Sequence, residues 1–141
     1  MPSFEAPSSG GPGGWWIQLE PGIQLEGSPE FIPDLGGWRQ ERVPRLPSGS
    51  WTLAPDWACE ILSPSTRAYD LRLKRPFYAR IGVQHLWFIN LDSRTLTVSG
   101  LYEGRWLELG THGEDDVIRA APFEDLELRL GGLWRSVQQS A

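Results

Sequence analysis

The sequence predicts a single α/β domain built on a mixed β-sheet. A strand-like run over residues 56–62 precedes a helical pattern over 66–81, and two further strand patterns follow at 85–91 and 95–101. The order strand, helix, strand, hairpin is typical of a mixed sheet in which a helix connects two neighbouring strands. A chain of 141 residues, of which 40% are hydrophobic, is also long enough to bury one core and too short for two.

The composition of the chain changes at both ends. Residues 1–14 are dominated by Pro, Ser and Gly, which predicts a flexible leader. We expect the domain itself over 15–134 and a frayed tail over 135–141. No run approaches the roughly 18 apolar residues of a membrane-spanning helix, and no signal-peptide pattern opens the chain, so we expect a cytoplasmic protein with no membrane partner.

The residues in front of the main strand predict short strands joined by turns. Strand-like hydrophobic runs, closed by Pro-containing turns, carry this prediction. The expected elements are a strand over 15–20, a returning segment over 23–25, an extended segment over 31–35, and a surface excursion over 36–55 with a hairpin strand at 51–53.

Two residues shape the predicted helix over 66–81. Pro76 lacks a backbone donor, so it should either kink the helix or begin a second short one. Gly82 is the expected stop signal. The elements expected after this helix are the strand over 85–91, a meander of strands over 95–101 and 106–109 joined at Glu103-Gly104, a charged loop over 112–116, and an edge strand over 126–130.

Three acidic residues are candidates for a metal site. Asp34 and Asp56 each follow a proline, and Glu60 lies within the strand over 56–62. Carboxylate oxygens suit Mg²⁺, and phosphodiester cleavage uses such a cation, so this skeleton is that of the PD-(D/E)xK nuclease pattern. Asp56 and Glu60 are four residues apart on one strand, roughly 13 Å at about 3.3 Å per residue, which is too far to share one ion. Asp34 on a neighbouring strand is therefore the better ligand, and we expect Asp56 to turn a loop or carry surface charge.

A lysine on the following helix completes the pattern. The position two residues after Glu60, where the plain pattern has its lysine, is Leu62. Lys74 lies one turn after Asp70, and Tyr78 one turn after Lys74, so the three line one helical face unless the proline between them rotates the last turn away. An ammonium there can orient water or stabilise phosphate charge. The ordinary alternative is that Asp70 and Lys74 form an exposed pair of little energetic weight, while Glu60 meets a surface arginine and Tyr78 packs.

Three segments resemble the sequence motifs of a known family. The segments are PDLGGWR over 33–39, PDWACEILSPST over 55–66, and the stretch from Asp70 through Lys74 and Tyr78 to Gly82-Val83 and Leu86-Trp87. Together they closely resemble the bacterial Uma-type restriction endonuclease family, and the resemblance extends from about Gly11 to Trp134.

The resemblance implies a restriction-endonuclease-like core with one main helix after the Glu60 strand and a β-meander. It also implies metal-ligand roles for Asp34 and Glu60, the lysine role for Lys74, and supporting roles for Asp70 and Tyr78. The chain departs from the family at its front, where only residues 1–9 stand in place of an early helix and one or more core strands. We therefore expect one face of the sheet to be bare, which favours aggregation or a homodimer.

The function that these residues predict is an Mg²⁺- or Mn²⁺-dependent DNA endonuclease. Asp34, Glu60 and the backbone carbonyl of Ile61 would hold the cation, and Lys74 would serve the water. The alternatives are a catalytically inactive relict that acts as a nucleic-acid-binding or protein-interaction module, and a structural β-rich domain in which the two acids point to different faces. The formal charge of -5 counts against a strongly basic, passive nucleic-acid binder. The candidates for phosphate contacts are Arg67, Arg72, Arg75 and Arg80 on the predicted helix.

Overall fold

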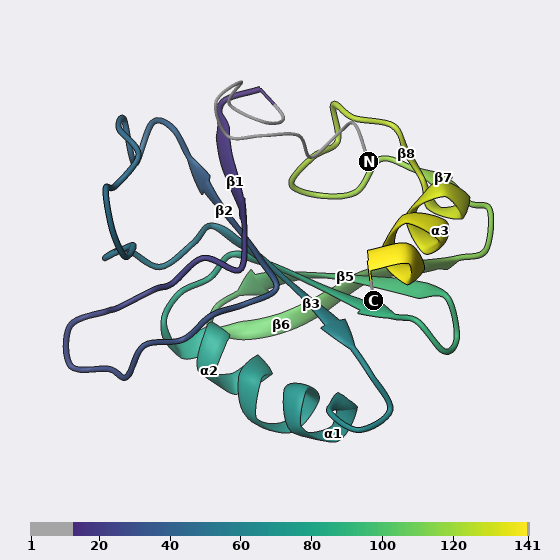
Figure 1. The fold of residues 1–141 in the computed structure, drawn as a ribbon, viewed down its shortest axis with the longest axis horizontal. Coiled ribbons are helices and arrows are strands. Elements are labelled where there is room, and N and C mark those ends of the chain that lie inside the picture. The colour runs from purple at the N-terminus through teal and green to yellow at the C-terminus, as the bar shows by residue number, and fades with distance from the viewer. Residues whose placement is uncertain (1–12, 141) are drawn as a thin grey trace.

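A computed structural model describes the backbone of residues 13–140 and the side chains of residues 13–135. Six strands form one mixed sheet in their chain order, from β1 at one edge to β6 at the other (Figure 1). The strands are β1 (Trp15–Leu19), β2 (Leu35–Arg39), β3 (Trp57–Leu62), β4 (His85–Asn90), β5 (Thr95–Tyr102) and β6 (Arg105–Gly113). Strands β3 and β4 are parallel, and every other neighbouring pair is antiparallel, which confirms the predicted mixed sheet.

The parallel pair β3 and β4 is joined by one continuous helical segment, which we call the crossover helix. Its parts are α1 (Arg67–Tyr69), a π-helical turn (Asp70–Lys74) and α2 (Arg75–Arg80). The helix predicted over 66–81 is thus confirmed, and Pro76 lies in the first turn of α2, directly after the π turn, so its missing donor falls where the hydrogen-bond pattern of the helix changes. Gly82 follows with φ +85°, a conformation that glycine adopts without strain, so the expected stop signal is also confirmed.

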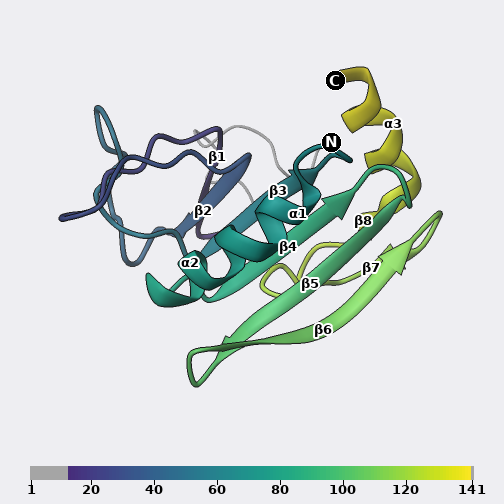
Figure 2. The same ribbon diagram turned by 90° about the horizontal axis from the view of Figure 1, so that it is seen from below.

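Both faces of the central strands β3 and β4 are covered within the described part of the chain, whereas edge strand β6 leaves Leu107 and Leu109 exposed. The crossover helix covers β3 and β4 on one face, and the C-terminal segment covers the other (Figure 2). The core on the helix side contains Ala58, Leu62, Tyr78, Val83, Leu86 and Phe88. The larger core on the other side joins Trp15, Trp57, Trp87 and neighbouring strand residues to Phe123, Leu128, Leu130, Leu133 and Trp134. The bare face that the short front predicts is therefore not observed over β3 and β4, and the expected homodimer has no support from these central strands.

Strand β2 runs through a glycine pair that the sequence assigns to a surface excursion. Glycine is normally depleted in strands, but here large rings leave no room for a side chain. A Cβ atom on Gly37 would lie 2.9 Å from Cδ1 of Ile17, 3.0 Å from Cε3 of Trp57 and 3.3 Å from Cε3 of Trp15. The excursion starts only at residue 40, because the two glycines allow β2 to pair with β1 and β3 beneath these rings.

Replacing Gly37 by alanine is expected to destabilise the fold by about 1–2 kcal/mol, because two buried tryptophan rings would have to shift. Gly132 in α3 is a matched control, since nothing lies within 4 Å of its added Cβ. Gly132→Ala should leave stability unchanged or raise it by up to about 1 kcal/mol. Urea unfolding of both variants measures the contrast, and equal midpoints for the two would contradict this account of β2.

The loops beyond β1 and β2 are held by tryptophan side chains. Trp38 and Trp51 stack at 3.6 Å between ring centroids. Their indole N–H groups donate to the Leu53 carbonyl and to Oε1 of Gln18, both at 3.0 Å. The expected hairpin strand at 51–53 is reduced to one bridge between Trp51 and Ile23. Buried stacking therefore fixes these loops where regular pairing does not.

The C-terminal segment differs most from expectation. Strands β7 (Val117–Ile118) and β8 (Leu128–Arg129) form a small ladder, and helix α3 (Leu130–Ser140) begins directly after it. The predicted edge strand over 126–130 is therefore mostly wrong, and residues 135–140, which the sequence assigns to a tail, continue helix α3. Leu133 and Trp134 pack into the core, and this burial outweighs the poor helix propensity of the two glycines before them.

Two further expectations concern the chain as a whole. The flexible leader predicted over 1–14 lies, apart from Gly13 and Gly14, outside the described residues. Within the described residues no helix is long and apolar enough to span a membrane.

Candidate active site

Glu60 is a buried carboxyl group on the helix side of β3. Successive strand residues point to opposite faces, so Glu60 shares its face with Ala58 and Leu62, while Cys59 points to the opposite core. Only 1% of Glu60 is exposed. Such burial is rare for an acid unless partners satisfy it, so its surroundings decide its role.

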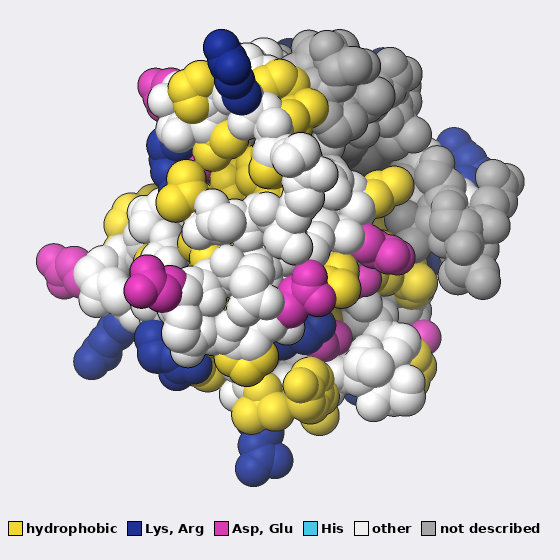
Figure 3. Space-filling view, turned by 60° about the vertical axis from the view of Figure 1, so that its left-hand side comes forward, with side chains coloured by type: hydrophobic (Ala, Val, Ile, Leu, Met, Phe, Trp, Pro, Cys, Tyr) yellow, Lys and Arg dark blue, Asp and Glu magenta, His cyan; other side chains and the backbone are white. Residues whose placement is uncertain are grey.

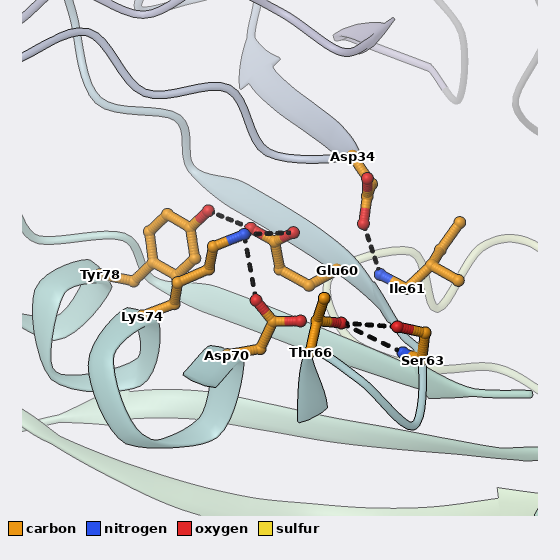
Figure 4. A network of polar contacts seen from close by, with 8 residues as sticks. All are labelled: Asp34, Glu60, Ile61, Ser63, Thr66, Asp70, Lys74 and Tyr78. Carbon is orange, nitrogen blue, oxygen red and sulfur yellow. Dashed lines mark hydrogen bonds and ion pairs between the residues drawn. The ribbon is translucent and has the colours of Figure 1, made fainter. Parts of the chain in front are cut away.

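The crossover helix supplies those partners (Figure 4). Nζ of Lys74 lies 3.3 Å from Oε1 of Glu60, and the Tyr78 hydroxyl donates a short hydrogen bond to Oε2. The same Nζ lies 3.1 Å from Oδ1 of Asp70, which is itself only 4% exposed. Glu60, Asp70, Lys74 and Tyr78 are called the carboxylate–lysine cluster below. The ordinary alternative, with a surface arginine for Glu60 and an exposed Asp70–Lys74 pair, is not what the structure shows.

The π turn explains how three residues of one helix reach the same strand. In a pure α-helix, residues four apart drift by about 40° around the axis at each step, so Asp70 and Tyr78 would diverge. A π turn is wider, and residues four apart drift in the opposite sense. The π turn from Asp70 to Lys74 therefore offsets the α-helical drift from Lys74 to Tyr78, and both Asp70 and Tyr78 are buried. The sequence alone does not decide whether Asp70, Lys74 and Tyr78 share one face, because a kink at Pro76 could rotate Tyr78 away from the other two residues.

Lys74 is the only lysine in the sequence; the rest of the 13 basic residues are arginines. Its side chain is 31% exposed, whereas those of Glu60 and Asp70 are 2% and 6% exposed. Lys74 is therefore the member of the cluster that meets solvent. A single lysine in a chain that otherwise uses arginine is a signal that would have strengthened its choice from sequence.

Asp34 approaches the cluster from strand β2. Leu35 pairs with Cys59, which brings the residue before Leu35 beside Glu60 and Ile61. Oδ2 of Asp34 accepts a hydrogen bond of 2.7 Å from the backbone N–H of Ile61. Figure 4 shows Asp34 on the opposite side of Glu60 from Lys74. The two acids that the sequence pairs therefore flank the same stretch of β3.

The electrostatics of the cluster favour a proton on Glu60. Burial raises the pKa of Glu60 from 4.5 to about 7, although the Tyr78 hydrogen bond and the Lys74 charge lower it; Asp34 raises it further. Burial lowers the pKa of Lys74, but Glu60 and Asp70 outweigh that effect and the net shift is upward. Burial and the charge of Glu60 raise the pKa of Tyr78, so its hydroxyl stays a donor. The cluster thus holds a firmly charged ammonium beside a carboxyl group that titrates near neutrality.

The oxygen donors at this end of β3 fit a hard divalent cation in their chemistry. Asp34 and Glu60 offer carboxylate oxygens and Ile61 offers a carbonyl, which are ligand types that Mg²⁺ accepts. Among the described residues, no three Asp, Glu, His or Cys side chains form a ready-made metal cluster. Both oxygens of Glu60 already have partners, so an ion there would share Glu60 with Lys74 and Tyr78.

Asp56, the rejected candidate, has a structural role. It is 7% exposed, its Oδ2 accepts a 2.8 Å hydrogen bond from the Arg39 backbone N–H, and its Oδ1 pairs with Arg42 at 2.7 Å. The expectation that it turns a loop is consistent with these bonds, whereas the expectation of surface charge is wrong. Its carboxylate holds the end of β2 because both oxygens point to that strand and the loop after it.

Phe31 is a residue of the site that the sequence reasoning missed. Its ring packs edge-on against Phe77 at 4.9 Å and Tyr78 at 6.2 Å between centroids. It precedes Asp34 by three residues, so it ties the Asp34 segment to the helix that carries Lys74. Its place in an apolar, Pro-containing run was visible, but its long-range contact was not.

The arginines of the crossover helix lie along its outer surface. Arg67, Arg72 and Arg80 are exposed and Arg75 is half-buried, with its carbonyl accepting a 2.8 Å hydrogen bond from the Trp106 indole. On the face drawn in Figure 3, basic, acidic and hydrophobic side chains are interspersed, and no single basic patch stands out. Phosphate contacts from these arginines therefore stay a prediction.

Comparison with known proteins agrees with this fold. The profile of the Uma2 family, described as "Putative restriction endonuclease", matches residues 6–131. A solved structure from Anabaena variabilis ATCC 29413, described as a putative nuclease belonging to DUF820, is similar with a TM-score of 0.66 and 25% identity, over 86% of this chain and 69% of that chain. A comparison with curated proteins gave no match. Because the family profile covers most of its length, this chain belongs to the Uma2 restriction endonuclease family and has its nuclease-like fold.

Proposed function

We propose that this chain is a divalent-metal-dependent DNA endonuclease whose reacting centre is Asp34, Glu60 and Lys74. The observation that carries the proposal is the convergence of Lys74 on the buried carboxylate of Glu60, with Asp34 beside the same strand. Family membership supports a nucleic acid as the substrate class. The cytoplasm remains the location that the sequence predicts.

Each residue of the centre has a role that its contacts support. Asp34, Glu60 and the Ile61 carbonyl would hold Mg²⁺ or Mn²⁺, which would polarise a phosphate oxygen of the substrate. Lys74 is partly exposed and carries three N–H donors, so it can reach a water molecule or a phosphate oxygen without leaving Asp70. Tyr78 and Asp70 are positioning residues, since the first orients Glu60 and the second holds Lys74.

The arginines on the crossover helix are proposed to contact the DNA backbone. Arg67, Arg72 and Arg75 follow the strand that carries Glu60, and Arg80 extends the row. Such contacts position a duplex without reading its sequence. They also concentrate positive charge on one helix of a chain whose net charge, with these arginines counted, is -5.

Asp34→Asn should reduce metal-dependent cleavage about 1,000-fold, because losing a charged ligand removes several kcal/mol of stabilisation. The asparagine oxygen can still accept the Ile61 hydrogen bond, so the fold should stay intact. Supercoiled plasmid incubated with the purified protein and MgCl₂ or MnCl₂ measures nicking. Asp92→Asn, at an exposed turn after β4, is the control and should cut like the wild type.

One observation favours the second candidate, a catalytically inactive relict that binds nucleic acid or protein. Glu60 is buried and both of its oxygens already have partners in the chain. That candidate predicts no metal-dependent nicking by the wild type, together with DNA binding in EDTA that Glu60→Gln leaves unchanged. Nicking that EDTA and Asp34→Asn both abolish would exclude it.

A further inference from the structure

Glu60 and Asp70 share one cation, which is the side-chain ammonium group of Lys74. Their carboxylates come from β3 and from the π turn, are 1% and 4% exposed, and meet the same Nζ of Lys74 at 3.3 and 3.1 Å. Two buried carboxylates from different elements that face one cation form a cation-binding position. In this protein the ammonium group of Lys74 occupies that position.

The formal charges around β3 match one additional divalent ion. With a cation bound, which favours the ionised form of Glu60, the carboxylates of Asp34, Glu60 and Asp70 would contribute three negative charges, and Lys74 would contribute one positive charge. The remaining two negative charges equal the charge of one Mg²⁺ or Mn²⁺. A second divalent ion would leave the buried site with excess positive charge, which is unfavourable where the surroundings screen weakly.

We propose that Lys74 occupies the place of a second metal ion, between Glu60 and Asp70, and thereby restricts the site to a single divalent ion on the Asp34 side of Glu60. This inference rests on the proposed metal-dependent function. Figure 4 shows the arrangement behind it, with Lys74 and Asp70 on one side of Glu60 and Asp34 on the other. Lysine suits this place because its ammonium is a compact point charge, while the 12 arginines (13 basic residues less Lys74) lie elsewhere.

The stoichiometry of Mn²⁺ binding tests the proposal, measured by calorimetry and by the electron paramagnetic resonance signal of free Mn²⁺. The wild type should bind a single ion. Lys74→Met keeps an unbranched apolar stem and removes the charge, so it should bind two ions, as two-metal nuclease sites do. The double variant Lys74→Met/Asp70→Asn lacks one of the two carboxylates of the second metal position, so it should again bind one Mn²⁺ ion. Lys74→Arg keeps the positive charge and should also bind one.

A spectroscopic readout follows from Lys74 being the only lysine. Protein labelled with ¹⁵N at lysine Nζ gives a single side-chain ammonium signal. With Lys74 held between Glu60 and Asp70, that signal should be visible without metal and should persist when Mg²⁺ saturates the site. Loss of the signal on Mg²⁺ binding would mean that the ion displaces Lys74, and the proposal would be overturned.

The outcomes separate this inference from the proposed function. A wild type that binds one ion, weakened by Asp34→Asn, together with a Lys74→Met variant that also binds one ion, overturns the inference and leaves the function intact. A wild type that binds two ions overturns the inference as well. If neither the wild type nor any Lys74 variant binds Mn²⁺, the metal-dependent function and the inference fail together. Circular dichroism of each variant confirms that the fold is retained.

Discussion

Replacing Glu60 by glutamine should sharply reduce DNA cleavage and, at the same time, stabilise the fold above neutral pH. The loss of cleavage follows from the loss of a charged metal ligand, an effect of several kcal/mol or about 1,000-fold in rate. The gain in stability follows from burial, since Glu60 is 1% exposed and its ionised form is unfavourable in the folded state. A glutamine of the same shape can still meet Lys74 through its oxygen and Tyr78 through its amide.

The direction of the pH dependence is set by the raised pKa of Glu60. In the unfolded chain this carboxyl group ionises near its ordinary value of 4.5, and in the folded protein near 7. Between these values the folded state binds more protons, so the free energy of unfolding falls as pH rises from 4.5 to 7 and stays reduced above 7. A shift of this size corresponds to about 3 kcal/mol. The raised pKa already includes the favourable contacts to Tyr78 and Lys74, so this figure is their net balance with burial.

Urea unfolding in EDTA at pH 5 and pH 8 measures this effect. Relative to wild type, Glu60→Gln should gain about 2–3 kcal/mol more at pH 8 than at pH 5. Glu41→Gln is the control, because Glu41 is exposed on the loop after β2, and its effect should not change with pH. An equal effect of Glu60→Gln at both pH values would mean that Glu60 is ionised as easily in the folded as in the unfolded chain.

The sequence predicts the sheet centre and its acid well, because that information is local. An apolar run that ends at a proline turn defines β3, and its alternation places Glu60 on the side of the following helix. The spacing of Asp70, Lys74 and Tyr78 likewise indicates a shared helical face. The metal roles of Asp34 and Glu60 remain predictions that geometry and family membership support.

The sequence fails where long-range packing overrides local preference. The glycines of β2 are typical of a loop until Trp15 and Trp57 fill the space above them. The glycines at the start of α3 disfavour a helix until Leu133 and Trp134 find a core to enter. The π turn is a third case, since its own five residues do not distinguish it from an α-helix. Pro76, two residues beyond, lacks a donor for the preceding turn, and the burial of Asp70 and Tyr78 on one face fits the wider turn.

Two substitutions of Lys74 are expected to separate its effect on stability, as a counter-charge to Glu60 and Asp70, from its effect on the rate of DNA cleavage. Lys74→Met leaves Glu60 and Asp70 facing each other without a cation, which should destabilise the protein at pH 8 by about 1–3 kcal/mol, less than for a fully buried pair because Lys74 is 31% exposed. At pH 5 the loss should be smaller, since Glu60 is then protonated. Cleavage should fall about 100- to 1,000-fold, the usual effect of removing a donor to developing charge.

Lys74→Arg should affect DNA cleavage but not stability. A guanidinium keeps the positive charge between Glu60 and Asp70, so stability at pH 8 should stay within about 1 kcal/mol of wild type. Its planar, bulkier group cannot take the position of a compact ammonium against a water molecule or phosphate, so cleavage should still fall about 100-fold. Plasmid nicking and urea unfolding on the same preparations provide both readouts. An arginine variant that cuts like the wild type would reduce Lys74 to a counter-charge, and a methionine variant that does so would remove it from the reacting centre.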